Sequence, residues 1–377
     1  MNRVALVAGG LARFGKRAAS WRDLAAEGGK ATLEDLPGLS PEKIDGVIVA
    51  TADEEPYLAA VTSEILGIKP KIATRVENLC SSGGTAITIA YSLISSGLIN
   101  KVLVLGVEKM SHRQTVPLLE WDFTRGGVLM PAAWGAVYAQ KHMEKFGTTE
   151  EQLALISVKN HRLSSMNPFA HFQKPVTLSE VMSSRHVVTP LKLYDCCSKS
   201  DGAAGVILAG EDEARSLTDT PVWIKGLGES SQGATFGNVN PEYVTWPCVK
   251  IAAKEAYQTA RVEANKIDLA MLHDAFTINE IIEYEDLGFA RKGEGGQFIE
   301  QGQSEIGGKV AVNTHGGLIG VGHPIGATGV AQAVEILAQF RGTAGKRQVG
   351  RVENGLTLNL SASVSTGNVI IYGRNSH

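Results

Sequence analysis

The sequence predicts an α/β protein with two related halves, and three observations support this prediction. The 377 residues are 44% hydrophobic and 20% charged, with 42 glycines, which is typical of a globular chain and not of a disordered or fibrous one. Short β-branched runs alternate with helix-length amphipathic stretches, which indicates βαβ units and a largely parallel sheet. A similar pattern occurs twice along a chain that is too long for one ordinary core, so we expect an internal duplication.

The expected strands and helices of the first half follow one another in a regular order. Residues 4–7 form a short apolar run that meets two glycines, and we interpret this run as a first strand and not as a secretory signal. Strands are expected again at 47–50 and 102–105, which are short apolar, β-branched runs. The stretches 57–66 and 84–96 between them have the length and periodicity of helices.

The middle of the chain differs from both flanks. From about residue 110 to 190 the strand signals become sparse, and helical, polar and proline-containing sequence replaces them. We therefore predict an N-terminal half at 1–115, an inserted loop domain at 116–190, the completion of the first half at 191–218 and a C-terminal half at 219–377.

The duplication is visible in two glycine-containing turns. A polar turn with Cys80 and two glycines opens an apolar helix that leads to the strand at 102–105. In the second half, the turn at 322–329 opens the apolar helix 330–340, which leads to a strand at 356–358. The two turns are therefore expected to occupy equivalent places in the two halves.

Charge, hydropathy and cysteine content exclude several kinds of function. The net charge is −3 with both signs interspersed, so no basic surface is expected for nucleic acid or an anionic membrane. The longest apolar runs are far shorter than the roughly 20 residues of a membrane-spanning helix. Only four cysteines occur, with no C-x-x-C pair and no metal-like spacing with histidine, so we expect no disulfide framework, no metal site and a cytoplasmic location. We also expect no bound cofactor.

Cys80 is the candidate nucleophile. It lies in N-L-C-S-S-G-G-T, residues 78–85, between extended sequence and a long apolar helix. The amino-terminal end of a helix favours a thiolate, so a lowered thiol pKa is expected here. The alternative is a small buried residue without chemistry, but a packed core rarely needs so many glycines and serines around one thiol.

Three histidines are candidate partners of this cysteine. His323 lies in the G-H-P-I-G turn at 322–326, and a positioned imidazole commonly activates a cysteine nucleophile. His273 follows the apolar strand 269–272, at the strand end where α/β folds build their sites, and could donate to an oxyanion. His315 lies eight residues before His323. The alternative for each is a histidine with only a hydrogen-bonding or solvated role.

Two further cysteines are adjacent in the sequence. A disulfide between neighbouring residues is strained, so Cys196 and Cys197 are expected to be two buried thiols. We assign them no chemistry.

These motifs together resemble the thiolase superfamily, with its N-x-x-C-x-S-G turn early and its G-H-P-x-G-x-[ST]-G turn late. The S-D-G-A-A sequence at 200–204 and N-T-H-G-G at 313–317 are also similar to family motifs, in the same order, over essentially the whole chain. The resemblance implies a thiolase fold, with two duplicated βαβαβαββ halves in α-β-α-β-α layers and an inserted loop domain.

Within the superfamily, H-D-A-F at 273–276 resembles the sterol-carrier-protein-type and archaeal thiolases, which include acetyl-CoA acetyltransferases; residues 160–161 and 167–174 also resemble the archaeal type. One departure concerns the second catalytic cysteine, which common thiolases carry in a C-x-G motif near the C-terminus. The aligned residues 359–363 contain no cysteine, and Ala275 does not supply one either. This second cysteine moves the α-carbon proton, so His315 or His323 is the expected replacement.

The resemblance also implies a reaction. His323 would deprotonate Cys80, the thiolate would attack a 3-oxoacyl-CoA, and His273 would stabilise the oxyanion; thiolytic cleavage with coenzyme A as co-substrate, or the reverse Claisen condensation, follows. Ser230 and Ser231 lie in a turn that resembles a CoA-binding element. A homodimer or dimer of dimers, and a small companion protein with a zinc ribbon and an OB-like fold, are implied in the same way.

Several alternatives remain open at this point. A short 3-oxoacyl-CoA is the default substrate, while the segment 238–247 resembles thiolase subunits that cleave an aromatic benzoylsuccinyl-CoA. The missing second cysteine allows a condensing or acyltransfer enzyme without full thiolysis. A noncatalytic scaffold descended from thiolases is a third alternative, although such a protein should tolerate the loss of Cys80 and His323.

Overall fold

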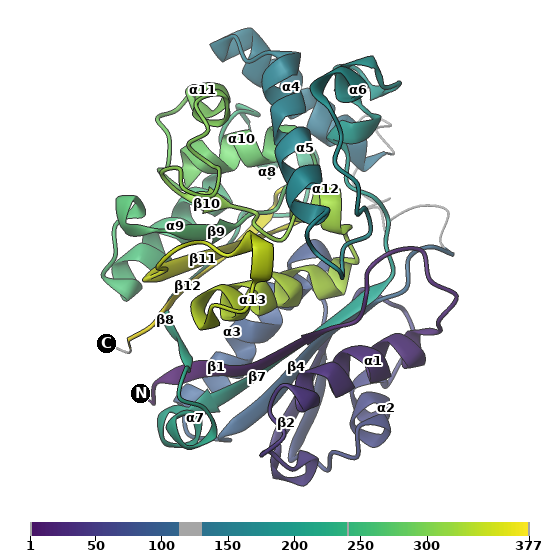
Figure 1. Cartoon of the computed structure of the whole chain (residues 1–377), viewed down its shortest axis with the longest axis vertical. Helices are drawn as coiled ribbons and strands as arrows, with labels where there is room; N and C mark the ends of the chain where they lie inside the picture. Colours follow the sequence, from purple (N-terminus) through teal and green to yellow (C-terminus); the bar gives the residue numbers. More distant parts are fainter. Residues whose placement is uncertain (1, 113–129, 240, 376–377) are drawn as a thin grey trace.

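The computed structural model describes residues 2–112, 130–239 and 241–375 (Figure 1). The strands are β1 (Val4–Leu11), β2 (Gly46–Ala50), β3 (Ile72–Val76), β4 (Lys101–Glu108), β5 (His186–Val188), β6 (Leu191–Lys192), β7 (Gly202–Gly210), β8 (Val222–Ser231), β9 (Leu269–Met271), β10 (Ala311–Val312), β11 (Asn354–Ser361) and β12 (Thr366–Gly373). The helices are α1 (Trp21–Glu34), α2 (Leu58–Ile65), α3 (Ser82–Ser95), α4 (Pro131–Phe146), α5 (Glu150–Ser164), α6 (Leu178–Ser183), α7 (Glu211–Leu217), α8 (Phe236–Val239), α9 (Pro247–Ala260), α10 (Thr277–Asp286), α11 (Gly295–Glu300), α12 (Gly317–Val321) and α13 (Ile325–Arg341).

Local sequence signals explain where several of these elements begin. Helix α1 starts at a capping box, in which Ser20 and Asp23 satisfy each other's backbone N–H groups. Helix α5 starts in the same way with Thr149 and Gln152. Strands β4 and β7 are buried along their whole length, which is why they read as continuous apolar runs without alternation.

The strand order confirms the internal duplication. The large sheet runs β10-β9-β11-β12-β8-β1-β7-β4-β2-β3. When the strands of each half are numbered one to five along the chain, both halves read 3-2-4-5-1 from the edge to the junction. The pairing directions also repeat, with strand 2 parallel to strands 3 and 4, and strand 5 antiparallel to strands 4 and 1. The halves meet through a short ladder between β1 and β8.

The expectation of a largely parallel sheet is wrong, because the sheet is mixed. In each half the fifth strand returns antiparallel to its neighbours, β7 between β1 and β4, and β12 between β8 and β11. In the second half a tight connection from β11 to β12 makes an antiparallel hairpin, which needs no crossover helix.

The helices complete five layers. Helix α1 packs on β1, β7 and β4, and α2 on β2 and β3, whereas α9 packs on β8 and β12 of the other half. Helices α3 and α13 pack on each other between the two halves (Figure 1). This arrangement confirms the predicted α-β-α-β-α layers and places the amino-terminal ends of the two central helices in the middle of the molecule.

Glycines of the two repeated turns allow this central contact. A Cβ atom on Gly329 would lie 2.3 Å from Asn359 Oδ1 and 2.6 Å from the Gly84 nitrogen, and one on Gly83 would lie 2.8 Å from the Val330 nitrogen. Helices α3 and α13 therefore cross with their backbones nearly in contact. The glycines that marked the repeat in the sequence are explained by close helix packing.

Gly329→Ala is expected to lower the free energy of unfolding by about 1–3 kcal/mol, because the added methyl group has no room and the central helices must move apart. Denaturant unfolding measures this change. Gly350→Ala is the matched control, since nothing lies within 4 Å of a Cβ at that position. Equal stability of the two variants would contradict the proposed packing role.

The segment between β4 and β7 carries α4, α5 and α6 with the small β5–β6 ladder, and these helices lie above the second half in Figure 1. The predicted boundary between residues 115 and 116 lies outside the described residues, and the other domain boundaries stay predictions. Within the part of the chain that the structure describes, we find no helix with both the length and the hydropathy needed to cross a membrane.

Candidate active site

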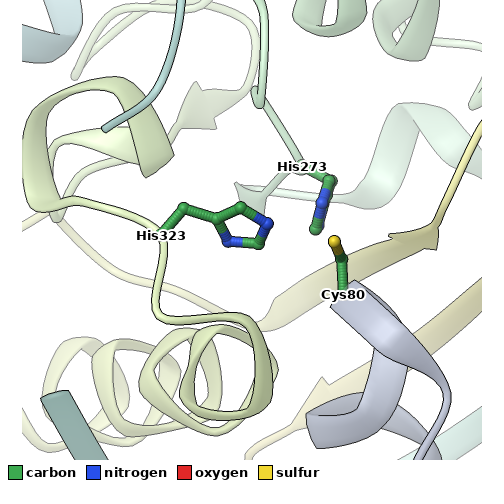
Figure 2. Close-up of side chains that lie close together, drawn as sticks. All are labelled: Cys80, His273 and His323. Atoms are coloured by element: carbon green, nitrogen blue, oxygen red, sulfur yellow. The ribbon is translucent and has the colours of Figure 1, made fainter. Parts of the chain in front are cut away.

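The structure brings three of the predicted residues together at the junction of the two halves. Cys80 comes from the turn before α3, His273 from the end of β9 and His323 from the turn before α13 (Figure 2). The Cys80 sulfur and one ring nitrogen of each histidine lie within 4.8 Å of one another. All three line a pocket of about 100 Å³. Its walls are mainly apolar and include Trp134, Tyr138, Phe276, Ile325, Leu360 and Val364.

A tight turn presents the cysteine. Cys80 lies in the single 3₁₀ turn Leu79–Ser81, directly before α3. Ser82 fixes this turn, because its hydroxyl accepts a hydrogen bond from the Asn78 N–H at 2.8 Å and donates one to the Leu79 carbonyl at 2.6 Å. Leu79 has a φ of 43°, a left-handed conformation that is uncommon for a non-glycine residue. Backbone strain of this kind is frequent at functional sites.

The environment of the thiol differs from the sequence expectation. Burial raises the pKa of Cys80 to about 12, and the negative charge of Glu108 adds to the rise, although hydrogen bonds from the backbone N–H groups of Ala362 and Cys80 oppose it. The predicted lowering of this pKa is therefore wrong in direction, because desolvation in an apolar pocket outweighs the helix terminus. Cys80 rests as a neutral thiol and needs a base.

His323 has the geometry of that base. The Thr328 hydroxyl donates to the Pro324 carbonyl at 3.1 Å, so it accepts from His323 Nδ1 at 2.7 Å. This assigns the proton to Nδ1 and leaves the lone pair on Nε2, which has no hydrogen-bond partner in the described residues. Burial lowers the pKa of His323 to about 4, so the ring is neutral near pH 7.

His273 stands against His323 edge to face, with ring centroids 5.1 Å apart. Burial, with a further contribution from the neighbouring His323, lowers the pKa of His273 well below its usual value, so this ring is neutral too. The backbone N–H of His273 donates to Glu283 Oε2 at 3.0 Å. The next residue, Asp274, accepts from the Leu318 N–H at 2.7 Å and so ties the His273 loop to α12, the element that leads to His323.

His315 is placed elsewhere. It does not line the Cys80 pocket and instead lines a second, smaller cavity with Phe14, Phe169 and Glu335. Burial lowers its pKa to about 4, and the nearby Glu335 opposes this change. The hypothesis that His315 replaces the missing second cysteine is therefore not supported by its position, and we leave it out of the catalytic group.

The two predicted CoA-contacting serines also lie outside this pocket. They form the end of β8, where Ser230 Oγ accepts from Gln232 Nε2 at 2.7 Å and Ser231 Oγ accepts from Thr366 Oγ1 at 3.3 Å. Both hydroxyls thus have local partners in the β8–β12 region. A contact with coenzyme A at this position stays a prediction.

Sequence reasoning missed two polar residues of the pocket, Cys197 and Asn279. The Cys197 N–H donates to the Ala275 carbonyl at 2.9 Å, which holds the cysteine beside the His273 loop. Asn279 follows in α10, and its Nδ2 lies 3.4 Å from the His273 carbonyl. The position of Asn279, one helical turn after the H-D-A-F motif, could have predicted that it lies near His273. No sequence spacing predicts that Cys197 lies in the pocket.

By donor type, Cys80, His273 and His323 could also hold a metal ion. No carboxylate completes this set in the described pocket, and a thiol with two neutral imidazoles is also the arrangement of a cysteine nucleophile with its base and oxyanion donor. We therefore assign these residues to thiol chemistry, and the prediction that no metal is bound stays a prediction.

The protein has a layered α/β fold of two repeated halves, with a cysteine and a neutral histidine where its central helices begin and a second neutral histidine at the end of β9, and this arrangement is typical of acyltransferases. The thiolase N-terminal domain matches residues 4–212, and the thiolase C-terminal domain-like family matches residues 232–374. The chain belongs to the thiolase family.

Relatives and solved structures agree with this assignment. The chain is 39% identical to an acetyl-CoA acetyltransferase of Methanothermobacter thermautotrophicus, covering 99% of this chain and 100% of that protein. It is 37% identical to sterol carrier protein 2 of Bos taurus, over 92% of this chain and 68% of the relative. The Ltp2–ChsH2(DUF35) aldolase superposes with a TM-score of 0.88 at 28% identity, covering 99% and 98% of the two chains. A human mitochondrial 3-ketoacyl-CoA thiolase with CoA, at 20% identity and a TM-score of 0.75, shares the fold over 100% and 98% of the chains.

Proposed function

We propose that this thiolase cleaves a 3-oxoacyl-CoA through an acyl intermediate on Cys80, or forms one by the reverse condensation. The observation that carries the proposal is the meeting of a neutral Cys80 thiol with the unpartnered Nε2 of His323 and the ring of His273 in one apolar pocket. A nucleophile, an acceptor for its proton and a donor for an oxyanion are the three groups that acyl transfer requires.

In the first half-reaction, His323 Nε2 takes the thiol proton and the Cys80 sulfur attacks the C3 carbonyl. The alkoxide that develops is stabilised by a ring N–H of neutral His273. Collapse of this intermediate breaks the C2–C3 bond and leaves an acyl group on Cys80 and the enolate of the shorter acyl-CoA, which must then gain a proton at C2. Because a buried thiolate–imidazolium pair is costly, the pair forms mainly when substrate is present.

In the second half-reaction, the thiol of coenzyme A attacks acyl-Cys80. The backbone N–H groups of Cys80 and Ala362 are directed at the sulfur, so the carbonyl oxygen of an acyl group on Cys80 would lie near them. These two donors are suited to the negative charge of the second tetrahedral intermediate. Its collapse releases the second acyl-CoA, and Cys80 regains its proton from His323.

The apolar wall of the pocket favours an apolar acyl group. Tyr138 lines the pocket and packs on Trp246 with centroids 5.4 Å apart and on Tyr243 at 6.3 Å. Tyr243 and Trp246, which belong to the segment 238–247 that resembles aromatic-substrate thiolases, therefore support the pocket wall; Asn240 lies outside the described residues. Short 3-oxoacyl-CoA and benzoylsuccinyl-CoA both remain proposed substrates.

Assembly is also part of the proposal. Strand β3 is an edge of the ten-stranded sheet, which supports pairing with a second copy in a homodimer or dimer of dimers. The similarity to Ltp2, which was solved with ChsH2(DUF35), supports a small companion protein. Light scattering of the purified protein, alone and with the candidate companion, measures both.

Incubation of the protein with acetoacetyl-CoA and coenzyme A tests the function. We expect acetyl-CoA as the product and an acetyl adduct that peptide mass spectrometry locates on Cys80. An adduct without CoA-dependent cleavage would indicate a condensing or acyltransfer enzyme. Cleavage of a 3-hydroxyacyl-CoA into a carbonyl compound and a shorter acyl-CoA, without an adduct or CoA consumption, would instead indicate an aldolase, the activity named for the Ltp2 complex. No adduct with acetoacetyl-CoA or benzoylsuccinyl-CoA would leave the noncatalytic scaffold.

A further inference from the structure

The proposed reaction needs one more group than the three residues described above. The enolate released by C2–C3 cleavage must be protonated at C2, and the same group must remove this proton in the condensation direction. The segment 359–363 contributes Leu360 and Ala362 to the pocket, and neither side chain can titrate. His315 lines a different cavity.

Among the described lining residues, the remaining side chains that can carry a transferable proton are Cys197 and Tyr138. The Tyr138 hydroxyl donates to the Ser363 carbonyl at 2.7 Å, so its proton is engaged in holding the 361–365 loop. Cys197 is close enough to Cys80 for the charge of one thiolate to raise the pKa of the other. Cys197 is therefore the group in the pocket to which no other role has been assigned.

Backbone contacts hold Cys197 between the loops of both catalytic histidines. On one side, the Cys197 N–H donates to the Ala275 carbonyl at 2.9 Å, and Cys196 forms an antiparallel bridge with Phe276. On the other side, Lys199 forms a parallel bridge with His323, and the backbone N–H of His323 donates to the Ser198 carbonyl at 3.2 Å. These contacts hold the backbone of Cys197 in a fixed position relative to the loops that carry both histidines.

We propose that Cys197 is the acid–base residue that transfers the α-carbon proton, in the thiolase reaction proposed above. The Cys197 thiol donates its proton to C2 of the enolate, which becomes the shorter acyl-CoA, and Cys197 becomes a thiolate beside protonated His323. This thiolate then takes the proton of the incoming coenzyme A thiol, whose sulfur attacks acyl-Cys80. The departing Cys80 thiolate receives the proton of His323, so all three groups return to their starting states.

The resting state of Cys197 suits this role. Burial raises the pKa of its thiol well above the usual value, so it is fully protonated when the enolate forms. An enolate of a thioester is a strong base, so even a thiol of high pKa is acidic enough to protonate it. Protonated His323 nearby offsets the charge of the resulting thiolate.

Cys196 provides a matched control on the same backbone. Its sulfur lies 3.6 Å from the Lys192 carbonyl, and it does not line the pocket. Cys197→Ala removes the acid, Cys197→Ser keeps the volume with a far less acidic hydroxyl, and Cys196→Ala removes a neighbouring thiol of the same kind.

The experiment separates the two proton transfers. Each protein is incubated with acetyl-CoA in D₂O, and two rates are followed. The first is acetylation of Cys80, in which Cys197 only protonates the departing thiolate of coenzyme A, a good leaving group. The second is deuterium incorporation at the acetyl carbon, which requires the α-carbon base. We expect both Cys197 variants to acetylate Cys80 within about 10-fold of the wild-type rate, because a thiolate leaves without full protonation, but to incorporate deuterium at least about 10²-fold more slowly. The Cys196→Ala variant should match the wild type in both rates.

Deuterium incorporation that persists in Cys197→Ala, or that falls equally in Cys196→Ala, would overturn this assignment while leaving acyl-Cys80 chemistry intact. Failure of the wild type to acetylate Cys80 would overturn the proposed function, and the assignment of Cys197 with it. Retained acetylation of Cys80 also shows that the Cys197 variants are folded.

Discussion

Cys80→Ala is expected to lower kcat for acetoacetyl-CoA thiolysis by at least about 10⁴-fold, because the sulfur that receives the acyl group is removed. Cys80→Ser should be almost as inactive. A serine hydroxyl is far less acidic than a thiol, and a base whose pKa is lowered to about 4 by burial cannot deprotonate it effectively. The rate of acetyl-CoA release, measured against wild-type protein under the same conditions, checks both expectations.

Stability separates a chemical effect from a structural one. Cys80 is only partly buried and packs at the edge of a small apolar cluster, so its truncation should change the unfolding midpoint little. Cys248→Ala is a useful control because that thiol is fully buried, donates to the Val364 carbonyl at 3.3 Å and does not line the pocket. Substantial thiolysis by folded Cys80→Ala would show that the acyl group is carried elsewhere.

His323→Asn should lower kcat/KM by about 10²–10⁴-fold, since the neutral Cys80 thiol then loses the acceptor for its proton. Initial rates at subsaturating substrate measure this loss.

The pH dependence of the wild-type enzyme tests the same role of His323 as a base. Burial lowers the pKa of His323 to about 4, so the base stays unprotonated as pH falls below 6.5, and kcat/KM should decline only as pH approaches 4. A pH series of initial rates measures this acid limb.

His315→Asn is the matched control for this substitution. His315 is also buried and its pKa is also lowered to about 4, but it lies in the separate cavity with Glu335. Activity per folded molecule should therefore stay within a few-fold of the wild type. A loss as large as that of His323→Asn would restore His315 as a catalytic candidate.

The sequence predicted the architecture and the centre of the pocket because both depend on local patterns. Strand and helix periodicity, and the repeated glycine turns, indicated two equivalent halves. Cys80 and His323 stand at equivalent turns, and His273 follows a buried strand, so their approach follows from the duplicated topology. The sheet direction was wrong because the fifth strand of each half has no sequence mark that distinguishes an antiparallel return from a parallel crossover.

The remaining features depend on contacts between distant segments. The direction of the Cys80 pKa shift is set by burial in a small apolar cluster with Ala52, Met110 and Ile325, which come from distant parts of the chain. His315 and His323 diverge because Gly316 and Gly317, with φ values of 114° and 59°, turn the chain between them. Cys197 reaches the pocket through bridges to residues in two other loops, so only the folded chain shows its proximity to Cys80.

The glycine-lined crossing of α3 and α13 makes each half of the molecule depend on the other. Each repeat opens its central helix with a turn at the same place, yet one turn retains the sulfur and the other retains the imidazole. The close crossing keeps these two turns side by side, so the sulfur of one half and the imidazole of the other form one site. Neither half therefore contains both the nucleophile and its base, and an isolated half would be inactive.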